Sequence, residues 1–147
     1  MIETLHKVYP DLYGNEYDEK EMDRRFEDLL KRHEELFGKK DAAIFSAAGR
    51  TEIAGNHTDH NLGKVIGGTI NLDTIGAVSR RSDNKVIINS EGFPVVEVDI
   101  SDLEPKEAEK NDTAALVRGI AEGFRRRGLT IGGWEANTTT RVLGGSG

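Results

Sequence analysis

The sequence predicts one domain in which two amphipathic helices pack with a β-sheet, and three observations carry this prediction. The length of 147 residues suits a single domain with an ordinary hydrophobic core. Apolar residues recur at helical spacing in two segments, 18–37 and 112–127. Short β-rich runs bounded by turn residues lie between and after these segments. Because their connections are short, we expect the strands to form an antiparallel meander.

The first helix is expected from about Asp18 to Phe37, with Gly38 as its C-terminal cap. We interpret His33, which lies on the apolar stripe, as a packed or half-exposed helix residue, because no partner motif for a ligand site is near. The stripe consists of residues spaced three and four apart: Met22, Phe26, Leu29, Leu30, His33 and Phe37.

The strands are expected from apolar and β-branched runs separated by turns. Residues 42–47 form a short strand that leads into a glycine-containing loop. Further extended pieces are expected at 65–66 with 69–70, at 75–79, at 85–89 and at 95–100, with turns at 82–84 and 91–92.

The second helix follows a charged stretch, Asp102 to Lys110, that reads as a solvated linker. Asn111 or Asp112 is its expected N-cap. We interpret the three arginines 125–127 as cations matched to the negative end of the helix dipole, in preference to a phosphate site. One face of the helix is expected to hold Ala114, Val117, Ile120, Ala121 and Phe124.

Residues 49–63 have the composition of a binding loop. They hold three glycines, an arginine, two histidines, two carboxylates and two asparagines, but only two large apolar side chains. A core segment would need a buried partner for each of these polar groups. Glycines at both ends and in the middle let the backbone turn sharply and approach a ligand closely. The loop therefore predicts a site for a small, hydroxyl-rich ligand.

The chain ends in a second glycine-rich segment, 142–147, which follows an expected strand at 134–140. A strand that leads into such a segment is the usual approach to a phosphate-binding helix N-terminus. Glycines alone fit a frayed terminal tail equally well, so the residues themselves leave both interpretations open.

Composition argues against several classes of partner. The net charge of −6 disfavours nucleic acid and anionic membranes. The first residues lack the apolar centre of a signal peptide, and no run approaches the length of a transmembrane helix. The absence of cysteine excludes disulfides and thiolate metal sites, which fits a reducing compartment. We therefore expect a cytoplasmic protein that acts on a small molecule.

Two motifs, well separated and in order, resemble the galactokinases of the GHMP kinase family. Residues 48–61, A-G-R-T-E-I-A-G-N-H-T-D-H-N, are similar to the family signature P-G-R-V-N-L-I-G-E-H-T-D-Y-N. Residues 142–147, V-L-G-G-S-G, are similar to the start of the family's phosphate loop, which continues L-S-S-S-A. Between them, Val117-Arg118-Gly119 resembles a V-K-G of the family. The resemblance covers about 40–147.

The resemblance implies an α+β fold in which helices pack on a mixed sheet, of the ribosomal protein S5 domain 2-like type. Residues 1–147 would form the N-terminal domain of a GHMP kinase, with 1–40 as a helical extension and the C-terminal remainder missing. The implied activity is that of an ATP- and Mg²⁺-dependent sugar 1-kinase, a phosphotransferase with an alcohol group as acceptor. Since family members are considerably longer, we expect the fragment to be inactive and to self-associate through uncovered apolar surface.

The resemblance also assigns site residues position by position. Arg50 would lie near the transferred phosphoryl group, where a permanent delocalised charge stabilises developing negative charge. Asn56, His57 and Asp59 would contact sugar hydroxyls. The family's catalytic base and its Mg²⁺-associated serine follow the position of Gly147, so no metal ligand is expected within the chain. Backbone N–H groups facing the ATP phosphates would come from Gly144, Gly145, Ser146 and Gly147.

The chain departs from the family pattern at four positions. Asn56 stands where the galactokinases carry a sugar-contacting glutamate, and an amide adds a donor while losing the charge. Ala48 replaces the signature proline and His60 the tyrosine. Thr113 falls near a tryptophan that many relatives place beside the adenine. These changes bear on which sugar is used more than on whether the protein is a sugar kinase.

Two alternatives stay open. The run 57–60, His-Thr-Asp-His, holds imidazole and carboxylate groups that can bind a metal, although three ligands within four residues would be cramped. A non-catalytic sensor that binds sugar and nucleotide and signals to a protein partner would also retain binding residues while changing others, such as Asn56.

Overall fold

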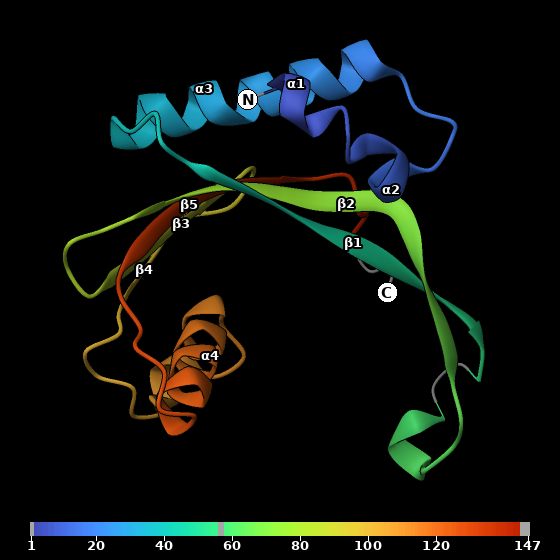
Figure 1. Cartoon of the computed structure of the whole chain (residues 1–147). Helices are drawn as coiled ribbons and strands as arrows, with labels where there is room; N and C mark the ends of the chain where they lie inside the picture. Colours follow the sequence, from blue (N-terminus) through green and yellow to red (C-terminus); the bar gives the residue numbers. More distant parts are fainter. Residues whose placement is uncertain (1, 56–57, 145–147) are drawn as a thin grey trace.

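The computed structural model describes residues 2–55 and 58–144, apart from the side chains of Glu3 and Asp59. Within these residues one sheet contains β1 (Ala43–Ala54), β2 (Ile66–Arg80), β3 (Lys85–Ser90), β4 (Val96–Asp99) and β5 (Trp134–Thr140). Helices α1 (Ile2–Leu5), α2 (Tyr9–Tyr13) and α3 (Glu19–Phe37) lie on one face, and α4 (Thr113–Arg126) lies on the other (Figure 1). Two short 3₁₀ helices, η1 (Asp59–Asn61) and η2 (Glu107–Glu109), lie in the connections.

The strand order β1-β2-β5-β3-β4 makes the sheet mixed. Strand β5 inserts between β2 and β3, antiparallel to β2 and parallel to β3. The antiparallel meander expected from the short connections is therefore wrong, because the last strand separates two strands that are consecutive in sequence. The mixed sheet with packed helices that the family resemblance implies is confirmed.

The prediction of a helix from about Asp18 to Phe37 with Gly38 as its C-terminal cap is confirmed, and Asp18 is the N-cap. The Asp18 carboxylate accepts hydrogen bonds from the N–H groups of Lys20 (2.9 Å) and Glu21 (3.2 Å). At the other end Gly38 adopts φ +68°, the left-handed conformation that glycine allows without strain, and donates to the Glu34 carbonyl (2.8 Å).

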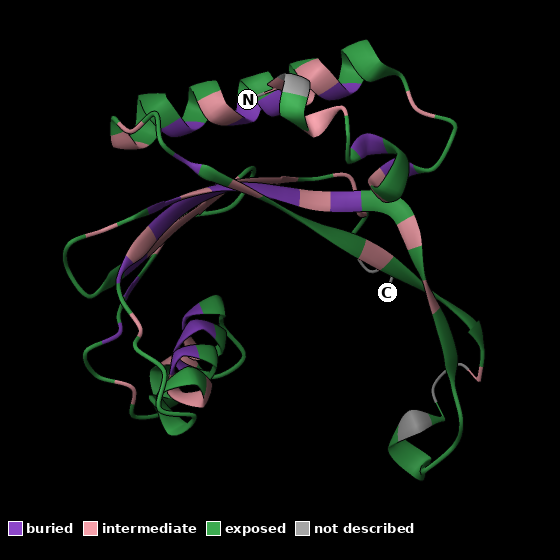
Figure 2. Ribbon diagram, viewed as in Figure 1, coloured by how far each residue is buried: buried purple, intermediate pink, exposed green. Residues whose placement is uncertain are grey.

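Each face of the sheet has its own apolar core (Figure 2). The first core joins the N-terminal helices to β2 and contains Tyr9, Tyr13, Met22, Phe26, Leu29, Ala42, Ile75 and Ala77. The second core joins α4 to β3 and β4 and contains Val86, Val98, Ile100, Ala114, Val117 and Ala121. Helix α3 therefore fixes the end of the sheet that carries β1, β2 and β5.

His33 is fully buried between α3 and the sheet, as the packed interpretation predicts. One ring nitrogen lies 3.0 Å from Asn137 Oδ1 and the other lies 2.9 Å from Ser79 Oγ. Ser79 also donates to Glu135, whose carboxylate pairs with Lys39 at 2.8 Å. Burial alone would raise the pKa of Glu135, but hydrogen bonds from Lys39, Arg81 and Ser79 outweigh burial and hold that pKa below its usual range.

Two strands are longer than expected. Residues 66–80 form one continuous strand, where two separate pieces were expected, and β1 continues to Ala54, so that it includes residues 49–54 of the expected loop. The first part of β2, before Thr74, pairs with β1 alone, and Thr51 lies opposite Gly68. The resulting β1–β2 ribbon projects from the sheet (Figure 1).

Helix α4 has the predicted N-cap, Asp112, but a different buried face. Ala114, Val117 and Ala121 are buried, whereas Ile120 and Phe124 are 53% and 48% exposed. Arg118 takes their place. It is 6% exposed, ion-pairs with Glu109 at 2.7 Å and donates to the carbonyls of Asp99 and Asp102, so it fastens the expected linker to the helix.

Arginines 125–127 at the end of α4 contact groups of the same helix, which agrees with their interpretation as cations at the helix C-terminus. Arg125 and Arg126 pair with Glu122 at 2.6 and 2.8 Å, and Arg127 donates to the Gly123 carbonyl. No helix among the described residues is long and apolar enough to cross a membrane.

Candidate functional site

The expected binding loop lies at the outer end of the β1–β2 ribbon. Residues 49–54 belong to β1, and residues 55–65, with the 3₁₀ turn η1, connect the two strands (Figure 1). The Arg50 side chain is 66% exposed, and the Glu52 carboxylate lies 3.9 Å from it. At that distance the pair is weak, so the Arg50 guanidinium is accessible to an anionic ligand.

Glycine is required at two points of this connection, because the loop closes on itself. Gly55 adopts φ +85°, and a Cβ there would lie 2.1 Å from the Lys64 carbonyl oxygen. A Cβ on Gly63 would lie 2.5 Å from Thr58 Cβ. Thr58 Oγ1 donates to the Gly55 carbonyl (2.7 Å), and Gly63 N–H donates to the Thr58 carbonyl (2.7 Å). These glycines give the loop its shape through close backbone contacts within it.

The residues assigned to the sugar lie in or beside this loop. Asn56 and His57 fall outside the described residues, and Asp59 opens η1 with its side chain outside the description. Among the side chains that the structure describes, no three His, Cys, Asp or Glu residues gather as a metal site. Since His57 and the Asp59 side chain lie outside that description, the metal alternative remains a hypothesis.

The glycine tail leaves the sheet directly after β5. Arg141 N–H donates to the Asp73 carbonyl (3.0 Å), which extends the β5–β2 ladder by one step. Val142 N–H then donates to Thr140 Oγ1 (3.1 Å). Gly144 is exposed, while Gly145, Ser146 and Gly147 lie outside the described residues.

The two motifs meet at Gly49. A Cβ built on Gly49 would lie 2.9 Å from Val142 Cγ2 and 3.1 Å from Ile70 Cδ1, closer than ordinary carbon contacts. Glycine at this position therefore lets the first residue of the tail pack against the start of the ribbon. Arg50 is the next residue along the ribbon, so the structure places it close to the point where the tail begins.

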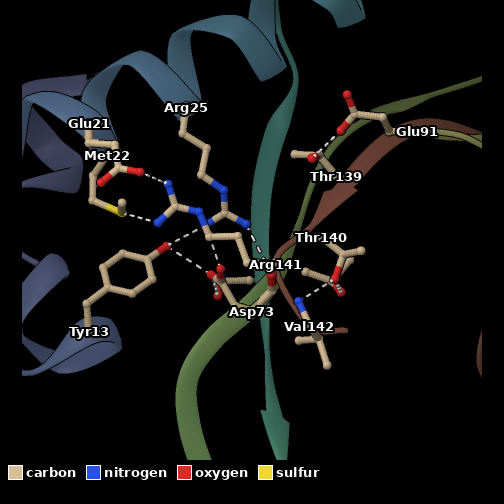
Figure 3. Close-up of polar contacts among 12 residues, drawn as sticks. Tyr13, Glu21, Met22, Arg25, Asp73, Glu91, Thr139, Thr140, Arg141 and Val142 are labelled. Carbon is tan, nitrogen blue, oxygen red and sulfur yellow. Dashed lines mark hydrogen bonds and ion pairs between the residues drawn. The ribbon is translucent and has the colours of Figure 1, made fainter. Parts of the chain in front are cut away.

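A buried polar cluster lies beneath this meeting point (Figure 3). The Asp73 carboxylate, in a residue 3% exposed, accepts hydrogen bonds from Tyr13 (2.9 Å), Ser46 (2.6 Å) and Arg25 (2.6 Å). Burial and the hydrogen bond to Asp73 raise the pKa of the Tyr13 hydroxyl to about 12. This cluster was not predicted from the sequence. Its signal was a single carboxylate inside a β-rich run, which is uncommon in a strand.

A hollow of about 290 Å³ lies on the other side of the strand end that carries the tail. Apolar side chains form one wall: Phe93 and Pro94 from the β3–β4 connection and Val96 at the start of β4. Thr113, the first residue of α4, lies in the same hollow. The remaining wall consists mainly of threonines at the end of β5 and on β2: Thr74, Thr138, Thr139 and Thr140.

Comparison with known proteins identifies the family. The galactokinase galactose-binding signature matches residues 31–80, which include Arg50, Asn56, His57 and Asp59. The galactokinase of Clostridium acetobutylicum is 34% identical over 130 residues, or 86% of this chain. This chain is a galactokinase-like member of the GHMP kinase family. A galactokinase from Lactococcus lactis subsp. cremoris is 40% identical over 85 residues, or 55% of the chain.

The fold of this galactokinase-like chain matches solved structures as well. The Lactococcus lactis galactokinase, solved in complex with galactose, is 30% identical with a TM-score of 0.70 over 82% of this chain. The mevalonate kinase of Methanococcus jannaschii, at 11% identity and a TM-score of 0.55 over 71% of the chain, shares the fold alone. The chain spans 31% of the Clostridium acetobutylicum galactokinase and 32% of the solved Lactococcus lactis chain, about a third of each.

Proposed function

We propose that this chain provides the sugar-facing loop and the start of the phosphate loop of an ATP-dependent sugar 1-kinase, which converts a hexose and ATP into hexose 1-phosphate and ADP. One observation carries the proposal. The segment that matches the galactose-binding signature contains the ribbon, and the base of the ribbon touches the first residue of the glycine tail. A phosphate held by the tail would then lie near Arg50, at the base of the same ribbon whose outer end carries the residues assigned to the sugar.

Each site residue has a role in this proposal. Arg50, accessible at the ribbon base, would neutralise charge on the transferred phosphoryl group. His57 and Asp59 would hold sugar hydroxyls, since a carboxylate accepts two such hydrogen bonds and thereby distinguishes epimers. Asn56 would read a hydroxyl pattern through one acceptor and one donor. Catalysis would rest on positioning and electrostatics, with little covalent chemistry.

The nucleotide would approach from the tail. Backbone N–H groups of residues 144–147 would face the ATP phosphates, with Mg²⁺ accompanying them, and we assign the ion no ligand within the chain. The adenine would lie in the hollow beside the tail, where Phe93 and Pro94 offer an apolar surface. Thr113, which falls near the position where many relatives place a tryptophan beside the adenine, lines this hollow, and its side chain cannot stack on the base.

The chain alone would be inactive, because it spans only about a third of its relatives. We assign residues 1–147 to the N-terminal domain, with 1–40 as the helical extension, and place the reaction in the cytoplasm. Phe45, on β1, is 60% exposed, and Ile53 and Ile66 on the ribbon are 68% and 59% exposed. Apolar surface of this kind favours self-association, which sedimentation would detect as a concentration-dependent mass.

A hybrid kinase tests the activity. In it, this sequence replaces the matched third of the Lactococcus lactis galactokinase, and ADP release is measured with a panel of hexoses. We expect sugar-dependent ADP release from the hybrid and none from the 147-residue chain. Arg50→Gln should lower kcat on the order of 10²-fold, as removal of one charge-stabilising donor does, while the KM for sugar stays nearly constant.

Arg126→Gln is the matched control, because Arg126 is 77% exposed and, within the described part of the chain, pairs with Glu122 of its own helix. It should leave kcat unchanged. A hybrid that melts cooperatively yet releases no ADP with any hexose would contradict the proposed function. Equal kcat values for Arg50→Gln and Arg126→Gln would contradict the role of Arg50.

A further inference from the structure

Arg141, the residue between β5 and the glycine tail, is held at both ends. Its N–H donates to the Asp73 carbonyl (3.0 Å), and its guanidinium donates to Glu21 Oε1 on α3 (2.6 Å). A second guanidinium nitrogen lies 4.0 Å from Met22 Sδ (Figure 3). The backbone of Arg141 is thus tied to the sheet, and its side chain reaches back to the helix that covers the sheet.

The Asp73 carbonyl, which accepts the hydrogen bond from the Arg141 N–H, is itself held in place. The Asp73 carbonyl also accepts from Arg25 (3.1 Å), and a carbonyl oxygen has two lone pairs for two such donors. The Asp73 carboxylate is held by donors from α2, α3 and β1. Arg141 and Arg25 therefore meet on one backbone group that has little freedom to move. We call Glu21, Arg25, Asp73 and Arg141 the tail clamp.

The tail clamp acts on the direction in which the chain continues. After Arg141, Val142 is held by its hydrogen bond to Thr140 and by its methyl contact against Gly49. Rotation of Arg141 would move Val142 off Gly49 and away from the ribbon that carries Arg50. In a site that works by positioning, a displacement of about 1 Å can cost on the order of 10²-fold in rate.

We propose that Arg141 is a positioning residue whose ion pair with Glu21 sets the direction in which the glycine tail leaves the sheet, and this inference rests on the proposed function of the tail. The alternative is a surface salt bridge without local consequence. Side chains of Arg141 and Glu21 are 33% and 47% exposed, and pairs so exposed contribute little to overall stability. Both interpretations therefore predict that loss of the ion pair hardly changes global stability, and only the positioning role predicts a change in the tail.

Amide NMR of the 147-residue chain separates them. We would compare Arg141→Gln and Glu21→Gln with the exchanged pair, Glu21→Arg combined with Arg141→Glu. Each single variant should speed hydrogen exchange at the amides of residues 141 and 142 by about two- to fivefold, the range expected for loss of a partly exposed ion pair. Their chemical shifts and that of Gly144 should change, the melting temperature should hardly change, and the exchanged pair should restore the shifts.

Val98→Ala is the matched control, since Val98 lies in the other core and its truncation lowers global stability without touching the tail. It should lower the melting temperature and leave the amide chemical shifts of residues 141, 142 and 144 unchanged. Unchanged tail amides in Arg141→Gln, or equal changes in Val98→Ala, would overturn the proposal. The measurement needs no nucleotide, so its failure counts against the tail clamp alone, whereas an inactive hybrid kinase counts against the proposed function alone.

Discussion

Replacement of Arg25 by methionine should destabilise the chain strongly, because it leaves a buried carboxylate without its counter-charge. The Arg25 and Asp73 side chains are 9% and 4% exposed and their charged atoms lie 2.6 Å apart. Removal of one partner from a buried ion pair costs about 3–5 kcal/mol. A domain typically has about 5–15 kcal/mol of stability in total. At about 2–4 °C per kcal/mol, the melting temperature should fall by about 6–20 °C.

Urea denaturation followed by circular dichroism measures this loss. Arg126→Met is the matched control, because its guanidinium is exposed, and it should cost no more than about 0.5 kcal/mol. Addition of Asp73→Asn to the Arg25→Met variant should recover part of the loss, since an amide needs no counter-charge. The reasoning is refuted if Arg25→Met costs no more than Arg126→Met, or if Asp73→Asn makes the double variant less stable still.

Three further predictions concern the site and its support. Gly49→Ala should cost about 1–3 kcal/mol through overpacking and shift the Val142 methyl resonances; unmoved resonances would contradict the contact. The raised pKa of Tyr13, about 12 against the usual 10.0, favours the protonated form in the folded state. The contribution of the protonated Tyr13 hydroxyl to the free energy of unfolding is therefore fully present below pH 10 and is lost as the pH rises from 10 to about 12. Tyr13→Phe should flatten the stability profile in that window, and a parallel profile would count against the assignment. In the hybrid kinase, Asn56→Glu should raise kcat/KM for galactose relative to other hexoses; an unchanged ratio would remove Asn56 from sugar selection.

Local signals were sufficient for the two long helices, α3 and α4, and for their ends, whereas α1 and α2 were not predicted from them. Asp18 and Gly38 mark the ends of α3 because a capping carboxylate and a left-handed glycine act on groups a few residues away. Strand β5 was also predicted from local signals, since Trp134 and Thr138 to Thr140 favour a strand. The packing of His33 followed from its position on the apolar stripe, although its partners Ser79 and Asn137 come from distant strands.

The sheet order could not be found from local signals. Parallel pairing of β5 with β3 depends on contacts between residues far apart in sequence, such as Val86 with Trp134. Strand β2 looked interrupted because Gly67 and Gly68 disfavour a strand, yet cross-strand pairing with β1 keeps them extended. The α4 face was misjudged because Arg118 buries its guanidinium on Glu109 and two carbonyls, and hydropathy does not anticipate such partners.

The site was found in part. The family resemblance assigned Arg50 and the two motifs, and the galactose-binding signature confirms the first motif as that of a galactokinase. The contact between Gly49 and Val142 and the cluster around Asp73 were missed, because each unites segments that only the folded sheet brings together. The sugar-binding roles of Asn56, His57 and Asp59 remain predictions.

An NMR titration of the 147-residue chain tests most directly whether the ribbon and the tail are the two halves of one sugar kinase site. Galactose should shift amides of residues 49–63, and Mg·ATP should shift those of residues 138–147, each in a saturable manner. His57→Ala should remove the response to sugar and keep the response to nucleotide. Shifts confined to α4, or no shift with either ligand in a folded chain, would contradict the account.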